Sequence, residues 1–197
     1  MRVNLNYLQK ANKCKSTDDN RYCLEGVYIK YNRETRELTY TATDSHVGYR
    51  ATELVDNIDA DDTFDNGLII DFDFKTIKAK DVIAVYIEKV EKNKVKITVL
   101  NEKQGSLSME ARVIDADFPE FDKVIPGEIT EDRKEFLDNT IQIFNWKHIK
   151  LMQELGFNWE SYYKYKHVDN NAARFDLDNE IFLMMPEKHN LKRYKNE

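Results

Sequence analysis

A strand-like stretch that begins at Ala173 ends in the sequence Leu183-Met184-Met185-Pro186. Thioether side chains are polarizable and adapt to irregular partners, so methionine is frequent at surfaces that bind several ligands. Methionine followed by proline at a strand end that solvent can reach therefore indicates one wall of an adaptable binding groove rather than a position in the hydrophobic core. Two segments far upstream have a composition that suits the opposite wall, and they run from Arg21 to Val27 and from Leu38 to His46.

The composition limits the classes of function that fit the chain. With 197 residues, the chain suits one large domain or two small ones. A net charge of −6 argues against a protein that coats nucleic acid with its whole surface, yet 30 Lys and Arg residues leave room for a local basic face. Cys14 and Cys23 are too few for a disulfide scaffold and lack metal-ligand spacing. With no signal peptide and no apolar run near the ~18 residues of a membrane span, we expect a cytoplasmic protein without membrane contact, metal or cofactor.

Hydrophobic alternation dominates the chain and predicts antiparallel strands joined by tight turns. An exposed acidic loop is expected at residues 57–67. Helical periodicity is confined to three short pieces, and an apolar strand-like stretch precedes each, so a β-α-β-β unit recurs about three times. The expected strands are Tyr22–Ile29, Leu38–Thr43, Val82–Val90, Val95–Leu100 and Ser106–Ile114. The expected helices, each with its preceding strand, are Tyr7–Lys15 after Val3–Leu5, Asp73–Asp81 after Leu68–Ile70, and Asn145–Leu155 after Ile141–Phe144.

Pairs of lysines recur on the expected helices, and each pair has the i, i+3 spacing that places both ammonium groups on one helical face. Exposed helix faces are often rich in lysine, and one such pair carries no functional meaning by itself. Recurrence on three helices favours a positive surface that contacts the phosphates of duplex DNA without reading its sequence. The pairs are Lys10 and Lys13, Lys75 and Lys78, and Lys147 and Lys150.

Three short sequence motifs, in this order and spacing, resemble those of the bacterial DNA polymerase III beta sliding clamps. They are Thr43-Asp44-Ser45-His46, Asp117-Phe118-Pro119 to Val124-Ile125-Pro126, and Met185-Pro186. The resemblance implies an α+β fold of the DNA clamp (processivity) architecture, with antiparallel sheets and short helices on one face. Residues 1–126 match the middle domain of that family. Residues 127–197 would form a shortened clamp domain that resembles the second half of the last domain. The missing domains suggest a phage or mobile-element version.

The same resemblance implies a hydrophobic pocket between the two domains that receives short linear peptides of replication proteins. Ser45 stands where the family usually has glycine, Gly48 where it has an aliphatic residue, and Glu187 where an apolar residue is common. The pocket is therefore expected to be shallower, with an altered peptide preference. Carried over by position, its residues are Leu24, Thr43, Ser45, His46, Gly48, Pro126, Leu183, Met185 and Pro186.

These features predict a processivity factor that tethers a DNA polymerase or another replication protein to duplex DNA. Such a factor does no chemistry itself, needs a clamp loader, and assembles as a homo-oligomer to which the short C-terminal part contributes. The alternative is a clamp-like adaptor or decoy that binds clamp-interacting peptides without encircling DNA. A nuclease or transferase is disfavoured, because His46 beside Asp44 has no nucleophile or third partner. The acidic residues from Asp59 to Asp65 lack the spacing of a calcium loop.

Overall fold

The computed structural model of the chain describes residues 1–55, 64–127, 143–159 and 172–187. The chain divides into two units, Met1–Pro119 and Glu120–Glu197, and each unit is described by itself. The sequence analysis places its domain boundary after Pro126, and the assignment of the two parts to clamp domains stays a prediction. Within the described ranges, no helix has the length and apolar character needed to cross a membrane.

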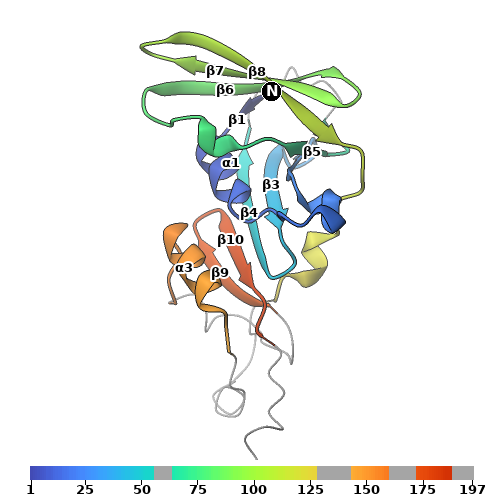
Figure 1. Ribbon diagram of the computed structural model, residues 1–197, viewed down its shortest axis with the longest axis vertical. Helices are drawn as coiled ribbons and strands as arrows, with labels where there is room; N and C mark the ends of the chain where they lie inside the picture. Colours follow the sequence, from blue (N-terminus) through green and yellow to red (C-terminus); the bar gives the residue numbers. More distant parts are fainter. Residues whose placement is uncertain (56–63, 128–142, 160–171, 188–197) are drawn as a thin grey trace, which may run out of the picture. The chain divides into compact units, whose positions relative to one another are not determined.

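The first unit is built on one antiparallel sheet (Figure 1), whose strands lie in the order β1-β6-β7-β8-β5-β2-β3-β4. Every neighbouring pair in this order is antiparallel. The described helices of the unit are few and short, so the expected α+β class with antiparallel sheets is confirmed. The strands are β1 (Arg2–Val3), β2 (Val27–Asn32), β3 (Glu37–Thr43), β4 (Val47–Leu54), β5 (Leu68–Asp71), β6 (Val82–Glu91), β7 (Lys94–Asn101) and β8 (Gly105–Ile114).

The hairpins form where the alternation and the turn residues predict them. Asn32 ends β2, and its side-chain oxygen accepts hydrogen bonds from the backbone N–H groups of Glu34 and Thr35 at 2.9 and 3.3 Å. This local bonding turns the chain back into β3. The hairpin of β6 and β7 places Ile87 opposite Ile97, and both side chains are fully buried. A slip of one residue would expose both, so burial fixes the register.

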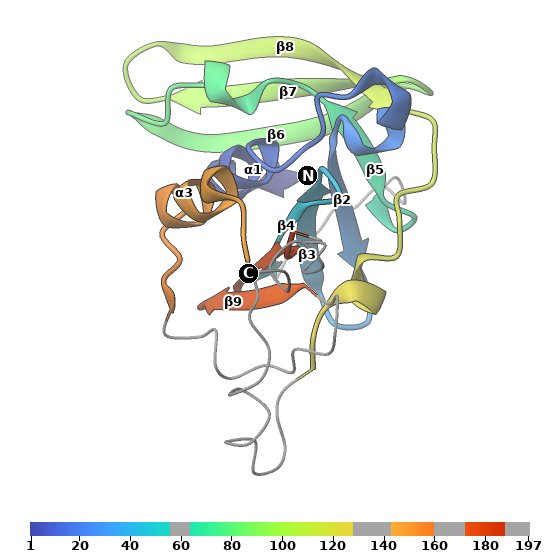
Figure 2. The same ribbon diagram turned by 60° about the horizontal axis from the view of Figure 1, so that its bottom comes forward.

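Helix α1 spans Leu5–Asn12 and begins earlier than the expected start at Tyr7. Asn4 caps it, because the side-chain oxygen of Asn4 accepts hydrogen bonds from the backbone N–H groups of Asn6 and Tyr7 at 3.0 and 3.3 Å. Its buried face, centred on Leu8, packs against β2, β3 and β4. Figures 1 and 2 both show the layer of β6, β7 and β8 beside this helix.

The prediction of a second helix at Asp73–Asp81 is wrong. Only a 3₁₀ turn, η3 (Phe74–Thr76), forms there. The side-chain amide of Gln9 on α1 donates hydrogen bonds to the carbonyl oxygens of Phe74 and Ile77, at 3.1 and 2.7 Å. Those carbonyls would be acceptors inside a longer helix. Phe74 and Ile77 are both buried, so the segment packs as an anchored turn instead of an amphipathic helix.

The strand expected at Tyr22–Ile29 forms only in its second half. Its first half belongs to the 3₁₀ helix η1 (Asp19–Leu24), which Asp18 caps, and β2 begins just after Gly26. A Cβ atom on Gly26 would lie 2.6 Å from the Cγ2 atom of Ile69 on β5. Glycine is therefore required where the chain leaves η1 and enters the sheet against β5.

Within the described ranges, the expected β-α-β-β unit is complete in its first copy, as β1-α1-β2-β3, and in the second copy η3 replaces the helix. Of the strand expected at Ile141–Phe144, residues 141–142 lie outside the described ranges and Ile143 and Phe144 have no regular structure. Most of the loop at 57–67 also lies outside those ranges. Its described end is partly buried, since the side chain of Phe64 is 2% exposed.

The second unit contains a helix and a hairpin. The helix expected at Asn145–Leu155 is confirmed with slightly shorter bounds. Phe157 and Phe182 lie 5.7 Å apart between ring centroids, and Phe175 and Trp159 meet edge to face at 5.2 Å. The three phenylalanine rings are buried and form the core beside the hairpin, whereas Trp159 is 38% exposed and lies at its edge. The described elements are η4 (Phe121–Val124), α3 (Trp146–Glu154), β9 (Ala173–Leu177) and β10 (Glu180–Met184).

Candidate peptide-binding and DNA-binding surfaces

The turn between β3 and β4 carries three of the predicted pocket residues, and hydrogen bonds to side chains fix its shape. The carboxylate of Asp44 accepts from the backbone N–H groups of His46 and Val47 at 2.7 and 2.8 Å. The hydroxyl of Thr43 accepts from the N–H of Ser45 at 3.0 Å and donates to the carbonyl of Val47 at 2.6 Å. Ser45 has φ of 78°, a conformation that favours glycine. Ser45 and His46 are exposed, so the turn presents their side chains to solvent.

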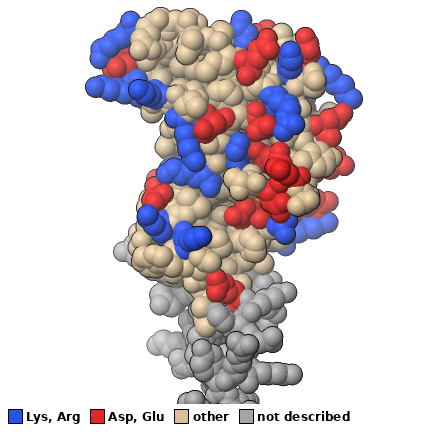
Figure 3. All heavy atoms as spheres, viewed as in Figure 1, with Lys and Arg blue, Asp and Glu red and all other residues tan. Residues whose placement is uncertain are grey.

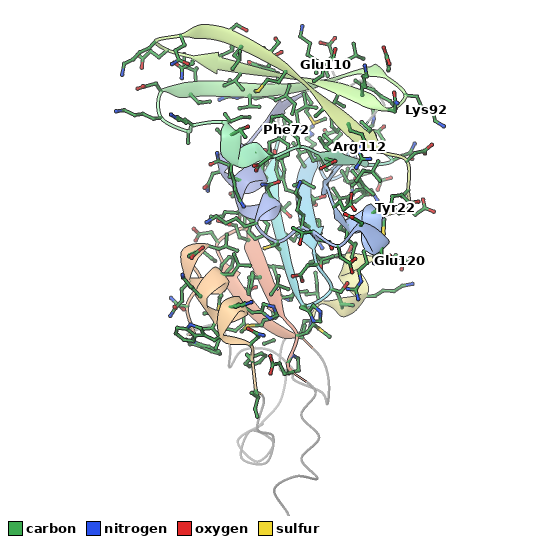
Figure 4. All side chains as sticks on the ribbon, in the orientation of Figure 1. Tyr22, Phe72, Lys92, Glu110, Arg112 and Glu120 are labelled. Atoms are coloured by element: carbon green, nitrogen blue, oxygen red, sulfur yellow. The ribbon has the colours of Figure 1, made fainter. Side chains whose placement is uncertain are left out.

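Helix η1 lies beside this turn. The guanidinium of Arg21 donates a hydrogen bond to the carbonyl of Asp44 at 3.2 Å, which ties the two segments together. Leu24 at the end of η1 is 6% exposed, and Gly48, which pairs with Thr43, is also buried. Tyr22 is 54% exposed and stands on the surface of η1 (Figure 4). Sequence reasoning placed Tyr22 in a strand and missed it as a surface aromatic. The polar cap Asp18 just upstream is the signal that indicates a helix instead.

The second unit brings together its own share of the predicted pocket. The carbonyl of Pro126 accepts a hydrogen bond from the guanidinium of Arg174 at 3.1 Å, and Arg174 pairs with Leu183 across the β9–β10 hairpin. Leu183 is 3% exposed, whereas Met185 and Pro186 are half-buried. Met185 and Pro186 are therefore the apolar residues that this segment offers to a ligand.

Glu187, which stands where the clamp family commonly has an apolar residue, fixes the backbone after β10. Its N–H donates to the carbonyl of Ile143 at 2.7 Å, and its carboxylate accepts from the side-chain amide of Asn145 at 2.9 Å. Asn145 is also the N-cap of α3. Glu187 thus joins the Met185-Pro186 segment to the start of α3, which gives the departure a structural reason.

The nine predicted pocket residues are brought together in two groups, one in each unit. In the first unit, Leu24 on η1 and the β3–β4 turn are linked through Arg21. In the second, Pro126 and Leu183 are linked through Arg174. The pocket that would combine the two groups stays a prediction.

Four of the six predicted DNA-contacting lysines lie on or next to α1 and η3: Lys10 is on α1, Lys13 is its C-cap, Lys75 is on η3, and Lys78 follows it. The i, i+3 argument fails for Lys75 and Lys78, because no α-helix forms there. Another contact compensates, since the side chain of Asn12 on α1 donates to the carboxylate of Asp73 at 3.0 Å and fastens η3 to α1. Lysines and arginines gather over α1 and its neighbours in Figure 3, while acidic side chains gather toward η1. The predicted DNA contacts of this unit are Lys10, which is partly exposed, and Lys13, Lys75 and Lys78, which are exposed.

The remaining two predicted DNA contacts lie on α3 of the second unit. Lys147 and Lys150 are both exposed on this helix. Lys150 lies 3.9 Å from the carboxylate of Glu154, one turn further along. Such an exposed i, i+4 pair contributes little energy and leaves the ammonium group accessible to a phosphate.

Asp44 and Cys14 both have structural settings. Asp44 uses its carboxylate to accept the backbone hydrogen bonds of the turn. Cys14 is 1% exposed, and burial, with a smaller effect from nearby Asp44, raises the pKa of its thiol well above its usual range. The thiol therefore stays protonated and unreactive. Over the part of the chain that the structure describes, no group of three His, Cys, Asp or Glu side chains is placed to hold a metal ion.

Comparison with known proteins shows similarity at the level of structure alone. No family model matches the sequence, and no curated protein sequence matches it significantly. Three solved structures illustrate the similarity. The DNA polymerase III subunit beta sliding clamp from Bartonella birtlesii, bound to griselimycin, has a TM-score of 0.67 and 17% identity over 94% of this chain and 64% of that one.

The DNA polymerase III beta subunit from Thermotoga maritima has a TM-score of 0.64 and 13% identity, over 96% of this chain and 65% of its own. The sliding clamp from Bacillus subtilis has a TM-score of 0.65 and 14% identity, over 94% and 62%. The chain therefore spans somewhat less than two thirds of the length of these clamps. The resemblance read from the sequence is confirmed at the level of the fold: this chain has the fold of the DNA polymerase III beta sliding clamps.

Proposed function

We propose that the chain is a reduced sliding-clamp-like processivity factor that tethers a DNA polymerase or another replication protein to duplex DNA. The observation that carries this proposal is the match of nearly the whole chain to sliding clamps, at 94% coverage in the Bartonella birtlesii structure. The factor does no chemistry itself, and a clamp loader places it on DNA.

The proposed docking surface for the polymerase is the predicted peptide pocket. The β3–β4 turn with η1 would supply one wall, and the Met185-Pro186 segment would supply the other. In both walls, side-chain hydrogen bonds hold the backbone. Ser45 and His46 are exposed and Met185 and Pro186 are half-buried, which suits the capture of a short flexible peptide. A flexible peptide loses entropy on docking, so a dissociation constant of about 1 μM is expected.

The proposed contact with duplex DNA is electrostatic. The lysines on and next to α1 and η3 would form one basic surface in the first unit, and Lys147 and Lys150 would form another on α3. Lysine–phosphate contacts carry no sequence information, which suits a protein that must move along DNA of any sequence. A homo-oligomer that surrounds the duplex would multiply these contacts.

A peptide titration tests the docking surface. A synthetic peptide that carries Gln followed by Leu and Phe anchors is titrated by calorimetry against the wild type and against Met185→Ala. Loss of the half-buried Met185 side chain is expected to cost about 1–2 kcal/mol of binding free energy. Met109→Ala, which removes a methionine from β8 outside the predicted pocket, is the matched control and should bind like the wild type.

Two outcomes would contradict the peptide pocket: no binding by the wild type, or equal affinity for the wild type and Met185→Ala. A scrambled peptide with the same composition separates specific docking from adhesion of apolar side chains. The far-UV circular dichroism of each variant shows that the fold is retained.

The second candidate is a clamp-like adaptor that binds the same peptides without encircling DNA. One observation favours it, because a 3₁₀ turn replaces the helix that was expected to carry Lys75 and Lys78 toward DNA. Sedimentation equilibrium at high micromolar concentration separates the two candidates. A closed oligomer supports the tethering factor, and a monomer that still binds the peptide supports the adaptor.

A further inference from the structure

The first unit contains a cavity of about 450 Å³ between β1, the end of β4 and the segment that leads into β6. This volume falls in the range of ligand-binding pockets. The predicted pocket residues of this unit cluster at the other end of the β3–β4 hairpin. The eight residues of β4 rise about 3.3 Å each and so separate the two ends by about 25 Å. The cavity is therefore distinct from the predicted peptide pocket of the proposed function.

One side of the cavity is an edge of β1, which pairs with β6 and with no other strand that the structure describes. The N-terminal amine of Met1 donates to the carbonyl of Ile87 at 2.7 Å, and the N–H of Ile87 donates to the carbonyl of Met1 at 2.8 Å. In an antiparallel ladder, bonded pairs alternate with non-bonded pairs. Arg2 opposite Tyr86 is thus a non-bonded pair, and the backbone N–H and C=O of Arg2 point away from β6.

The end of β4 forms another side of the cavity and has the same property. The N–H of Val55 donates to the carbonyl of Arg36 at 2.9 Å, so the next pair, Leu54 opposite Glu37, is a non-bonded one. The backbone N–H and C=O of Leu54 therefore point away from β3. Two residues that line the cavity, Arg2 and Leu54, thus carry backbone donors and acceptors that their own ladders do not use.

The side chains of the cavity add one fixed charge and an apolar rim. The carboxylate of Glu53 accepts a hydrogen bond from the hydroxyl of Tyr40, and that hydroxyl accepts from the N–H of Asn4 at 2.9 Å. Among the described contacts, Glu53 has no ion pair, so its second carboxylate oxygen is available to a ligand. Leu54 and Ile83 line the cavity with side chains that are 74% and 61% exposed.

We propose that this cavity is a second binding site, which takes an extended peptide with one basic side chain between apolar neighbours. The peptide backbone would pair with Arg2 and Leu54 as an added strand, its ammonium or guanidinium group would meet Glu53, and its apolar side chains would cover Leu54 and Ile83. Arg2 also lines the cavity and carries a positive charge, but its side chain is exposed to solvent. The carboxylate of Glu53, in contrast, is held in place by the hydrogen bond from Tyr40. The fixed negative charge therefore selects the ligand.

Fluorescence anisotropy with labelled peptides tests the site. The probe is the hexapeptide Ser-Val-Lys-Val-Ser-Gly, and the matched probe replaces its lysine by glutamate. The wild type should bind the lysine probe saturably and the glutamate probe about tenfold more weakly. Glu53→Gln, which keeps an acceptor for Tyr40, should weaken the lysine probe by about threefold to tenfold. Glu88→Gln, an exposed acid of β6 that does not line the cavity, is the control and should leave binding unchanged.

A variant that blocks the cavity with a large side chain tests peptide binding independently of charge. Ala79 is exposed and lines the cavity, so Ala79→Trp should fill it and abolish binding without loss of the fold. An excess of the Gln-Leu-Phe peptide should not displace the lysine probe, because the two sites are separate. Absence of saturable binding, equal affinity for the two probes, or unchanged binding by Glu53→Gln or Ala79→Trp would overturn the proposal.

Discussion

At the scale of single residues, Tyr40 connects three elements of the first unit. It is fully buried on β3, its hydroxyl donates to Glu53 on β4, and the same hydroxyl accepts from the N–H of Asn4, the N-cap of α1. Burial, and then the nearby charge of Glu53, raise the pKa of Tyr40 well above its usual value. One side chain thus ties the start of the helix to the hairpin.

We expect Tyr40→Phe to lower the free energy of unfolding by about 1–3 kcal/mol, because the N–H of Asn4 loses its acceptor in a buried site. Urea unfolding followed by circular dichroism measures the change. Tyr86→Phe is the control, since Tyr86 is 40% exposed and its hydroxyl has no hydrogen bond among the described contacts. Equal losses in the two variants would mean that the hydroxyl of Tyr40 contributes nothing specific.

The pH dependence of stability follows from the same residue. A folded-state pKa above the unfolded value of 10.0 means that the folded chain keeps the phenol proton where the unfolded chain releases it. This stability is fully present below pH ~10 and is lost as the pH rises through the folded pKa. The free energy of unfolding should therefore fall more steeply above pH ~10 in the wild type than in Tyr40→Phe. Parallel curves for the two proteins would contradict the assignment.

At the scale of elements, β8 has an edge that no described strand of its unit covers. It pairs with β7 from Gly105 to Arg112, but with β5 only from Arg112 to Ile114. Leu107 lies opposite the buried Val99 on the core face of the sheet, yet it is 58% exposed. An uncovered strand edge with an apolar side chain on its core face invites pairing with another strand. The predicted homo-oligomer fits this edge.

A proline tests that edge without breaking the sheet. The N–H of Val113 donates to the carbonyl of Asn93, so by alternation Ser108 opposite Thr98 is a non-bonded pair whose N–H faces the open edge. Ser108→Pro should therefore shift the sedimentation equilibrium toward the monomer and leave the β7–β8 ladder intact. Ser108→Ala loses the same hydroxyl but keeps the N–H, and should assemble like the wild type. An unchanged mass for Ser108→Pro would exclude β8 from the interface.

The elements also show how far sequence reasoning reaches. Local patterns predicted the hairpin at Asn32 and the helix that begins after Asn145, because neighbouring residues decide turns and caps. The same reasoning failed for η3, because Gln9, 65 residues away from Phe74, supplies the hydrogen bonds that replace a helix. The hydrophobic periodicity of a segment carries no information about hydrogen bonds that a residue far away in the sequence makes to it. The predicted start of β2 was wrong for a related reason. The close approach of β5 requires glycine at position 26, and no local pattern reports that contact.

At the scale of the whole molecule, the predicted site residues divide between two units. The short motifs that carry the clamp resemblance contain several of these residues. Thr43, Ser45 and His46 lie in one hydrogen-bonded turn, and Met185 and Pro186 follow the end of one strand. Local sequence was sufficient for each of these two groups, because neighbouring residues decide a turn and a strand end. The predicted pocket combines residues from distant parts of the chain, which no local pattern reports. The peptide titration with Met185→Ala tests that prediction.

The basic surfaces make a prediction for the molecule on DNA. Each lysine–phosphate contact releases counterions, so the loss of one contact should flatten the log–log dependence of affinity on salt by about 0.9. The double variant Lys75→Glu with Lys78→Glu should therefore flatten the slope by about 1.8 and weaken duplex binding without changing its lack of sequence preference. Lys92→Glu is the matched control, because Lys92 pairs with Asp115 at 2.9 Å in the β6–β7 turn (Figure 4). If the double variant kept the wild-type slope on a 30-base-pair duplex, the surface of α1 and η3 would not face DNA.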